Sequence, residues 1–170
     1  DAVIFSASQY ETRRNFTKPS NARDGTLIHA TNTAAKGGIK YYHVDPAETR
    51  NEKVKMFGVK KVIFGETSRA SALLDSDGKY GTTQQTISIS VSTDNEGDKI
   101  REAITSPSFK ICMRYLTVSG GFRLDWRGLR KFRKDFYKAF LPGGAIHKLY
   151  EEGKLNAPAE RKCGYVPPKG

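Results

Sequence analysis

The strongest constraint on the fold is a change of hydrophobic period about halfway along the chain. From Thr86 to Val91, isoleucine or valine alternates with serine, a period of two that is typical of a half-buried strand. The segment from Asp94 to Ile104 is instead helical in composition, with Asp94 as the expected cap. Strands first and helices later predict an α+β fold, with a mixed or antiparallel sheet in the N-terminal two-thirds.

Four further strands are predicted before this change. The clearest runs from Val59 to Phe64, a β-branched segment between two glycines. The turn residues Asp75-Ser76-Asp77-Gly78 end another strand, and Gly78 can adopt a positive φ angle. A short helix is predicted from Ser6 to Asn15. The other three predicted strands run from Leu27 to Ala30, from Ile39 to Val44 and from Ala70 to Leu74.

Helices are predicted for most of the C-terminal part. Ser106-Pro107 is a helix start, because proline is tolerated in the first turn, and the helix should end near Leu116. A last strong helix is predicted from about Asp125 to Phe140. We expect residues 1–144 to form one domain and residues 145–170 to be a polar, extended tail after a possible short helix from Ile146 to Glu152.

The predicted helix near 125–140 is basic and amphipathic. Its apolar residues recur every three or four positions: Phe122, Trp126, Leu129, Phe132, Phe136 and Phe140. Its cations recur with similar spacing on another face: Arg123, Arg127, Arg130, Lys134 and Lys138, widened by Lys131 and Arg133. Like charges at this spacing repel, and bound phosphate would relieve that cost. The expected DNA contacts among these cations are Arg123, Arg127, Arg130, Lys131 and Lys134. The alternative is a solvated face of a core helix, and we expect the aromatics themselves to be core.

The overall charge points to an anionic partner. The formal net charge is +11 and the sequence pI is about 9.7. Such an excess bears on partners rather than on fold, and nucleic acid is the first candidate, ahead of an acidic membrane surface. A basic protein that is merely soluble would have the same composition. No apolar run is long enough for a membrane span, and the partner that we expect is DNA and not a membrane.

A second candidate contact is the loop that follows Asp75, with the sequence DSDGKYGTTQQ. Glutamine can pair bidentately with adenine, and threonine or lysine can meet phosphates or base edges. The residues expected to read a DNA groove are Lys79, Tyr80, Thr82, Thr83, Gln84 and Gln85. An ordinary hairpin connection is the alternative. Arg13 and Arg14 are further candidates for DNA contact.

Several kinds of chemistry are not supported by the sequence. The DSDG run resembles the start of a calcium loop, but Lys79 stands where an oxygen ligand is needed and Thr86 stands where a Glu is needed. There is no P-loop, no G-x-S-x-G and no G-x-G-x-x-G motif. The two cysteines are far apart and no CxxC occurs, which argues against a zinc site and for a reducing, cytoplasmic compartment. We therefore expect no catalytic residue, no metal and no cofactor in this chain.

The order of these segments resembles the C-terminal, TaqI-like specificity region of restriction–modification N6-adenine DNA methyltransferases. The matching pieces are Leu27 to Thr31 (LIHAT), Phe57 to Glu66 (FGVKKVIFGE), Asp75 to Gln84 (DSDGKYGTTQ) and Phe122 to Phe140. The resemblance covers roughly residues 6–141. It implies a target-recognition domain that enters the groove of double-stranded DNA beside a methyltransferase catalytic domain, in the same or another chain.

The family's methyl-transfer motif, of the N/D-P-P-Y/F type, is absent. The resemblance thus implies that S-adenosylmethionine binds in a separate catalytic domain and that this chain alone does not methylate or cleave DNA. Because the chain starts with Asp1 rather than Met, we expect a fragment of something longer, although a processed product would look the same. The resemblance implies that the parent is a site-specific adenine methyltransferase or a fused restriction enzyme. The competing interpretation is a basic structural or RNA-binding protein, such as a ribosome-associated one, which the charge fits equally well.

Overall fold

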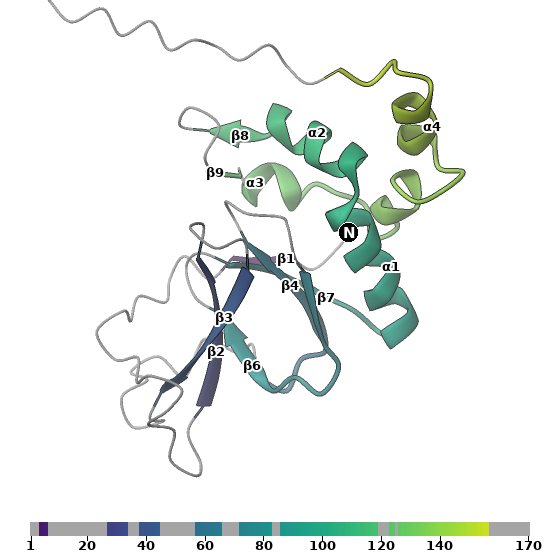
Figure 1. Cartoon of the computed structure of the whole chain (residues 1–170). Helices are drawn as coiled ribbons and strands as arrows, with labels where there is room; N and C mark the ends of the chain where they lie inside the picture. Colours follow the sequence, from purple (N-terminus) through teal and green to yellow (C-terminus); the bar gives the residue numbers. More distant parts are fainter. Residues whose placement is uncertain are drawn as a thin grey trace, which may run out of the picture.

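A computed structural model provides the structure of the protein. It describes residues 4–6, 27–33, 38–44, 57–65, 72–82, 86–118, 123–124 and 126–156. The first half forms seven strands, β1 to β7, and the second half is mainly helical (Figure 1). The predicted α+β class is confirmed. Of the helix predicted from Ser6 to Asn15, Ser6 belongs to strand β1 and the rest lies outside the described residues.

Four strands make an antiparallel sheet with the order β1-β7-β4-β5. The strands are β1 (Ile4–Ser6), β4 (Lys61–Gly65), β5 (Ala72–Asp75) and β7 (Thr86–Ser90). The predicted strands at 59–64, 70–74 and 86–91 are thus found within one or two residues of their expected ends. A second, mixed sheet has the order β3-β2-β6, formed by β2 (Leu27–Thr33), β3 (Gly38–Val44) and β6 (Tyr80–Thr82).

The central strands β4 and β7 are buried on both faces. Their register places Val62 opposite Ile89 and Phe64 opposite Ile87, and these four side chains belong to the main core. The prediction of a half-buried strand at 86–91 was wrong, because Ser88 is 0% exposed. Ser88 shares the other face of the sheet, and the second sheet covers it through contacts of β2 with β4 and β7.

Helix α1 packs on the four-stranded sheet through β4 and β5, and helix α2 packs on α1 and adds Phe109 and Met113 to the same core (Figure 1). Helix α1 (Asp94–Thr105) begins at Thr93, whose side chain accepts the amide hydrogen of Glu96, while the Glu96 carboxylate accepts that of Ser92. This is close to a capping box, so the prediction of Asp94 as the cap was off by one residue. Helix α2 (Pro107–Tyr115) begins as predicted, with Ser106 as its cap.

The residues after α2 form short elements in place of one long helix. They are β8 (Thr117–Val118), β9 (Arg123–Leu124), α3 (Trp126–Leu129), the 3-10 helix η4 (Phe136–Ala139) and α4 (Ala145–Glu151). Helix α4 agrees with the short helix predicted near 146–152, and it contacts α2 and η4. The division of the chain at residue 144 stays a prediction.

The predicted basic helix at 125–140 was wrong as a continuous element. After α3, the amides of Lys131 and Phe132 bond to carbonyl oxygens three residues back, and the same pattern recurs at Phe136 and Phe140. A continuous helix would place like charges four residues apart on one face, as at Arg130 and Lys134. The phenylalanines reach the core without such a helix.

Candidate nucleic-acid interface

The connector from Arg130 to Lys138 is the most cationic stretch that the structure describes. Its nine residues hold five cations and one carboxylate, Asp135. All five cationic residues are exposed, and the segment runs from the end of α3 into η4. The cations are Arg130, Lys131, Arg133, Lys134 and Lys138. Because the segment is not one helix, these side chains are not confined to a single helical face.

Apolar anchors on both sides hold the connector against the core. Leu129 is 2% exposed and Phe140 is 7% exposed, and both belong to the main core. The half-buried side chains of Phe132 and Phe136 pack against it, and their ring centroids are 5.2 Å apart. The aromatics described here are therefore core residues, as expected. They fix the connector at intervals, so the charged residues between them are held at the surface.

The ion pairs leave most of this positive charge without a close carboxylate. Within the described part of the chain, Asp135 lies 3.5 Å from Nε of Arg133, which is itself 87% exposed. No ion pair with a described carboxylate is found for Lys131, Lys134 or Lys138. Like charges this close in sequence repel one another, and a bound polyanion would lower that repulsion.

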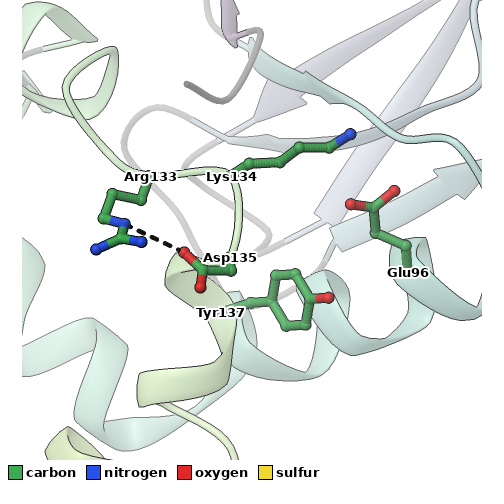
Figure 2. A pocket seen from close by; sticks show the side chains of 5 residues that line it. All are labelled: Glu96, Arg133, Lys134, Asp135 and Tyr137. Atoms are coloured by element: carbon green, nitrogen blue, oxygen red, sulfur yellow. Dashed lines mark ion pairs between the residues drawn. The ribbon is translucent and has the colours of Figure 1, made fainter.

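An open hollow lies where the connector meets the first turn of α1. Glu96, Arg133, Lys134, Asp135 and Tyr137 line it. Figure 2 shows Arg133 turned toward Asp135 on one side, with the Lys134 side chain extended away from that pair. Glu96 is already engaged as a cap of α1, and the hollow has two carboxylates among its five side chains. This mixture of signs makes it a poor site for a small anion, so the exposed connector itself is the candidate surface.

The turn between β5 and β6 presents the other group of predicted contacts. Lys79 is exposed, and its ammonium lies 2.8 Å from the carboxylate of Asp77. A hydrogen bond and the charge of Asp77 raise the pKa of Lys79, so it is a cation at neutral pH. Tyr80 is half-buried, and its amide donates to Asp75. The pairing of Lys79 with Asp77 leaves this turn less positive than the connector.

A buried ion pair underlies this turn, and the sequence analysis missed it. Lys61 is 0% exposed and Asp75 is 2% exposed, and their charged groups are 2.5 Å apart. The Asp75 carboxylate also accepts the amide hydrogens of Lys79 and Tyr80. Burial lowers the pKa of Lys61, and the hydrogen bond and charge of Asp75 partly offset that effect. The sequence signal for this pair was Lys61 inside an apolar strand, together with Asp75 at the end of the next predicted strand.

The structure brings some of the predicted contact residues together and separates others. Arg130, Lys131 and Lys134 share the connector, whereas Lys79 ends the separate β5–β6 turn and Tyr80 begins β6. Arg123 lies in β9 and Arg127 in α3, so their predicted place on one helix with Arg130 was wrong. Thr82 ends β6. Arg13, Arg14, Thr83, Gln84 and Gln85 lie outside the described residues.

Two charged residues of the connector were not among the predicted contacts, although the sequence shows them. Arg133 and Lys138 fall in the same basic run as the predicted residues, and both are exposed. Their sequence signal was the density of positive charge, which does not depend on a helical face. The participation of Tyr137 and Glu96 in the hollow had no sequence signal, because it follows from the contact between η4 and α1.

The described residues offer little else for chemistry. No group of three or more His, Cys, Asp or Glu side chains among them could hold a metal ion. Cys112 is a free, half-buried thiol on α2, and burial raises its pKa, which disfavours the reactive thiolate. None of the helices described is long and apolar enough to cross a membrane.

Comparisons with known proteins do not identify the chain. No protein-family model, no curated protein and no solved structure matches it. The charge and the geometry of the connector therefore carry the functional argument.

Proposed function

We propose that this chain binds double-stranded DNA through the connector from Arg130 to Lys138. The observation that carries the proposal is the local charge, five exposed cations and one carboxylate in nine residues, on a chain whose net charge is +11. Duplex DNA presents a dense line of phosphates, and each neutralised phosphate releases condensed counterions. A surface with this excess of exposed positive charge gains affinity from that release.

The resemblance of the sequence to a TaqI-like specificity region favours a narrower role. We infer that the chain is the target-recognition module of a restriction–modification adenine methyltransferase, partnered by a catalytic domain that binds S-adenosylmethionine. In that role the connector would contact phosphates, and base reading would fall to the segment that includes Lys79, Tyr80, Thr82, Thr83, Gln84 and Gln85. Phosphate contacts position such a module, while base contacts specify its target.

A salt titration of matched lysine variants tests the proposal. Lys134→Ala removes an exposed cation of the connector and should weaken binding to every duplex, with the slope of log K against log salt falling by about 1. Lys148→Ala is the matched control. Lys148 is also exposed, but it lies two residues after Ile146 and so points to nearly the opposite side of α4 from the connector.

Three outcomes would count against the proposal. Equal affinities and salt slopes for Lys134→Ala, Lys148→Ala and the unchanged protein would show that the connector is a solvated surface. Binding to structured RNA but not to duplex DNA would favour the RNA-binding alternative. Transfer of a labelled methyl group to DNA by the pure chain would contradict its role as a non-catalytic module.

A further inference from the structure

An open apolar groove of about 500 Å³ is formed by the connector and the residues that follow it. Its apolar lining comes from η4, its neighbours and the start of α4, and three charged residues complete it. The lining residues are Phe132, Arg133, Asp135, Phe136, Lys138, Ala139, Phe140 and Ile146. This volume falls within the range of about 300–1,000 Å³ that is typical of ligand pockets. The groove thus joins aromatic surface to two cations of the proposed DNA-binding connector.

The aromatic wall of the groove is built on the core. Phe136 has ring contacts with Phe109, Phe132, Tyr137 and Phe140, at centroid distances from 5.2 to 6.5 Å. Phe109 is 1% exposed, and its ring meets that of Phe140 edge-on at 5.1 Å. These contacts hold the rings in place, so the groove is formed before any ligand arrives.

The groove has an aromatic wall and two cations against one carboxylate, Asp135, which pairs with Arg133, and it therefore favours a ligand that combines a flat apolar surface with negative charge. An intact duplex exposes phosphates and base edges but keeps the faces of its bases stacked on one another. An unpaired nucleotide offers both parts, because its base can stack on an aromatic side chain while its phosphates meet Arg133 and Lys138. We propose that the groove binds an unpaired base of a DNA strand whose backbone follows the connector, which rests on the proposed DNA binding.

The charge distribution favours a nucleic-acid strand over an acidic peptide. Arg133 and Lys138 at the groove continue a run of cations that includes Arg130, Lys131 and Lys134. A strand carries one negative charge at each nucleotide and can meet successive cations of that run while one base enters the groove. A peptide would need several acidic residues beside an aromatic one to match the same surface.

The test compares three DNA ligands of one sequence: a blunt duplex, the duplex with a three-nucleotide gap, and the single strand. The full chain should bind the gapped duplex roughly 10-fold more tightly than the blunt one, as expected for stacking of one base on an aromatic ring. A 2-aminopurine placed in the gap should lose fluorescence on binding. This second measurement requires no variant of the protein.

Phe132→Leu tests the aromatic wall of the groove. It removes an aromatic ring but keeps an apolar side chain at a half-buried position, so the ratio of gapped-duplex to blunt-duplex affinity should fall to about 1, whatever the change in blunt-duplex affinity itself. Lys134→Ala should instead weaken binding to the blunt and gapped duplexes alike.

Each contrary result has a distinct meaning. Equal affinity of the unchanged protein for blunt and gapped duplexes, without loss of fluorescence, overturns the groove inference and leaves the proposed function standing. A gap preference that survives in Phe132→Leu also overturns it. Failure to bind any of the DNA ligands overturns the proposed function and this inference with it. Absence of gap preference together with Phe132-dependent binding of a Glu- and Phe-rich peptide would make the groove a protein-docking site.

Discussion

Gly78→Ala is expected to destabilise the protein by about 2–5 kcal/mol, whereas Gly58→Ala should cost only about 1–2 kcal/mol. The two glycines are a matched pair. Gly58 has φ +72° and Gly78 has φ +68°, and the amide of Gly58 donates to the carbonyl oxygen of Gly78 at 2.9 Å. Both therefore hold a left-handed backbone conformation, in two turns that contact each other directly.

The magnitude follows from two separate effects. A side chain in the left-handed region costs about 1–2 kcal/mol, and this applies equally at both positions. A Cβ atom at Gly58 would meet nothing within 4 Å, but one at Gly78 would lie 2.6 Å from the backbone C of Gly58 and from N of Val59. Backbone atoms cannot rotate away, so the turns must separate, which costs about 1–3 kcal/mol more by analogy with overpacking.

Urea denaturation followed by circular dichroism measures the difference. With an m-value of about 2 kcal/mol/M, the Gly78→Ala midpoint should lie roughly 0.5–1.5 M below that of Gly58→Ala. Gly78→Asn is a useful third variant, since asparagine tolerates the left-handed region but keeps the Cβ clash. It should remain clearly less stable than Gly58→Asn. Equal midpoints within either matched pair would refute the close packing of these two turns.

Three other predictions concern the charged groups and the thiol of the described region. Asp75→Asn leaves the buried ammonium of Lys61 without its counter-ion and should lower the free energy of unfolding by about 3–5 kcal/mol in denaturant melts. The double variant Lys61→Met/Asp75→Asn should recover part of this loss. Equal stability of the single and double variants would argue against the ion pair. The hydrogen bond from Lys60 lowers the pKa of Asp94, so the Lys60–Asp94 pair stabilises the protein above the ordinary carboxyl pKa, and this stabilisation is lost as the pH falls through the lowered value. Lys60→Met should return the pKa of Asp94 toward normal in an NMR titration. An unchanged pKa would contradict this cause. Burial raises the pKa of Cys112 and so disfavours its thiolate. In a Cys163→Ser background at pH 8, the Cys112 thiol should react with a disulfide reagent several-fold more slowly in the native protein than in urea. Equal rates would show that the thiol is not protected.

The sequence by itself determined the local elements and their order. The alternation from Thr86 to Val91 indicates a strand, and Ser106-Pro107 marks the start of α2, because period and capping depend on neighbouring residues. Gly78 signalled a tight turn for the same reason. The positive charge of residues 130–138 was also readable directly, since it does not depend on how the segment folds.

Only the tertiary structure decided which faces are buried and how the basic segment runs. Ser88 is buried because a second sheet covers its face, and Lys61 meets Asp75 because β4 pairs with β5 in that register. The spacing of four residues between Phe132, Phe136 and Phe140 fits an α-helix, yet the amides of all three bond to carbonyl oxygens three residues back. Packing against Phe109 and the rest of the core, together with repulsion between close cations, favours the broken connector. These are contacts between residues distant in sequence, which no local pattern encodes.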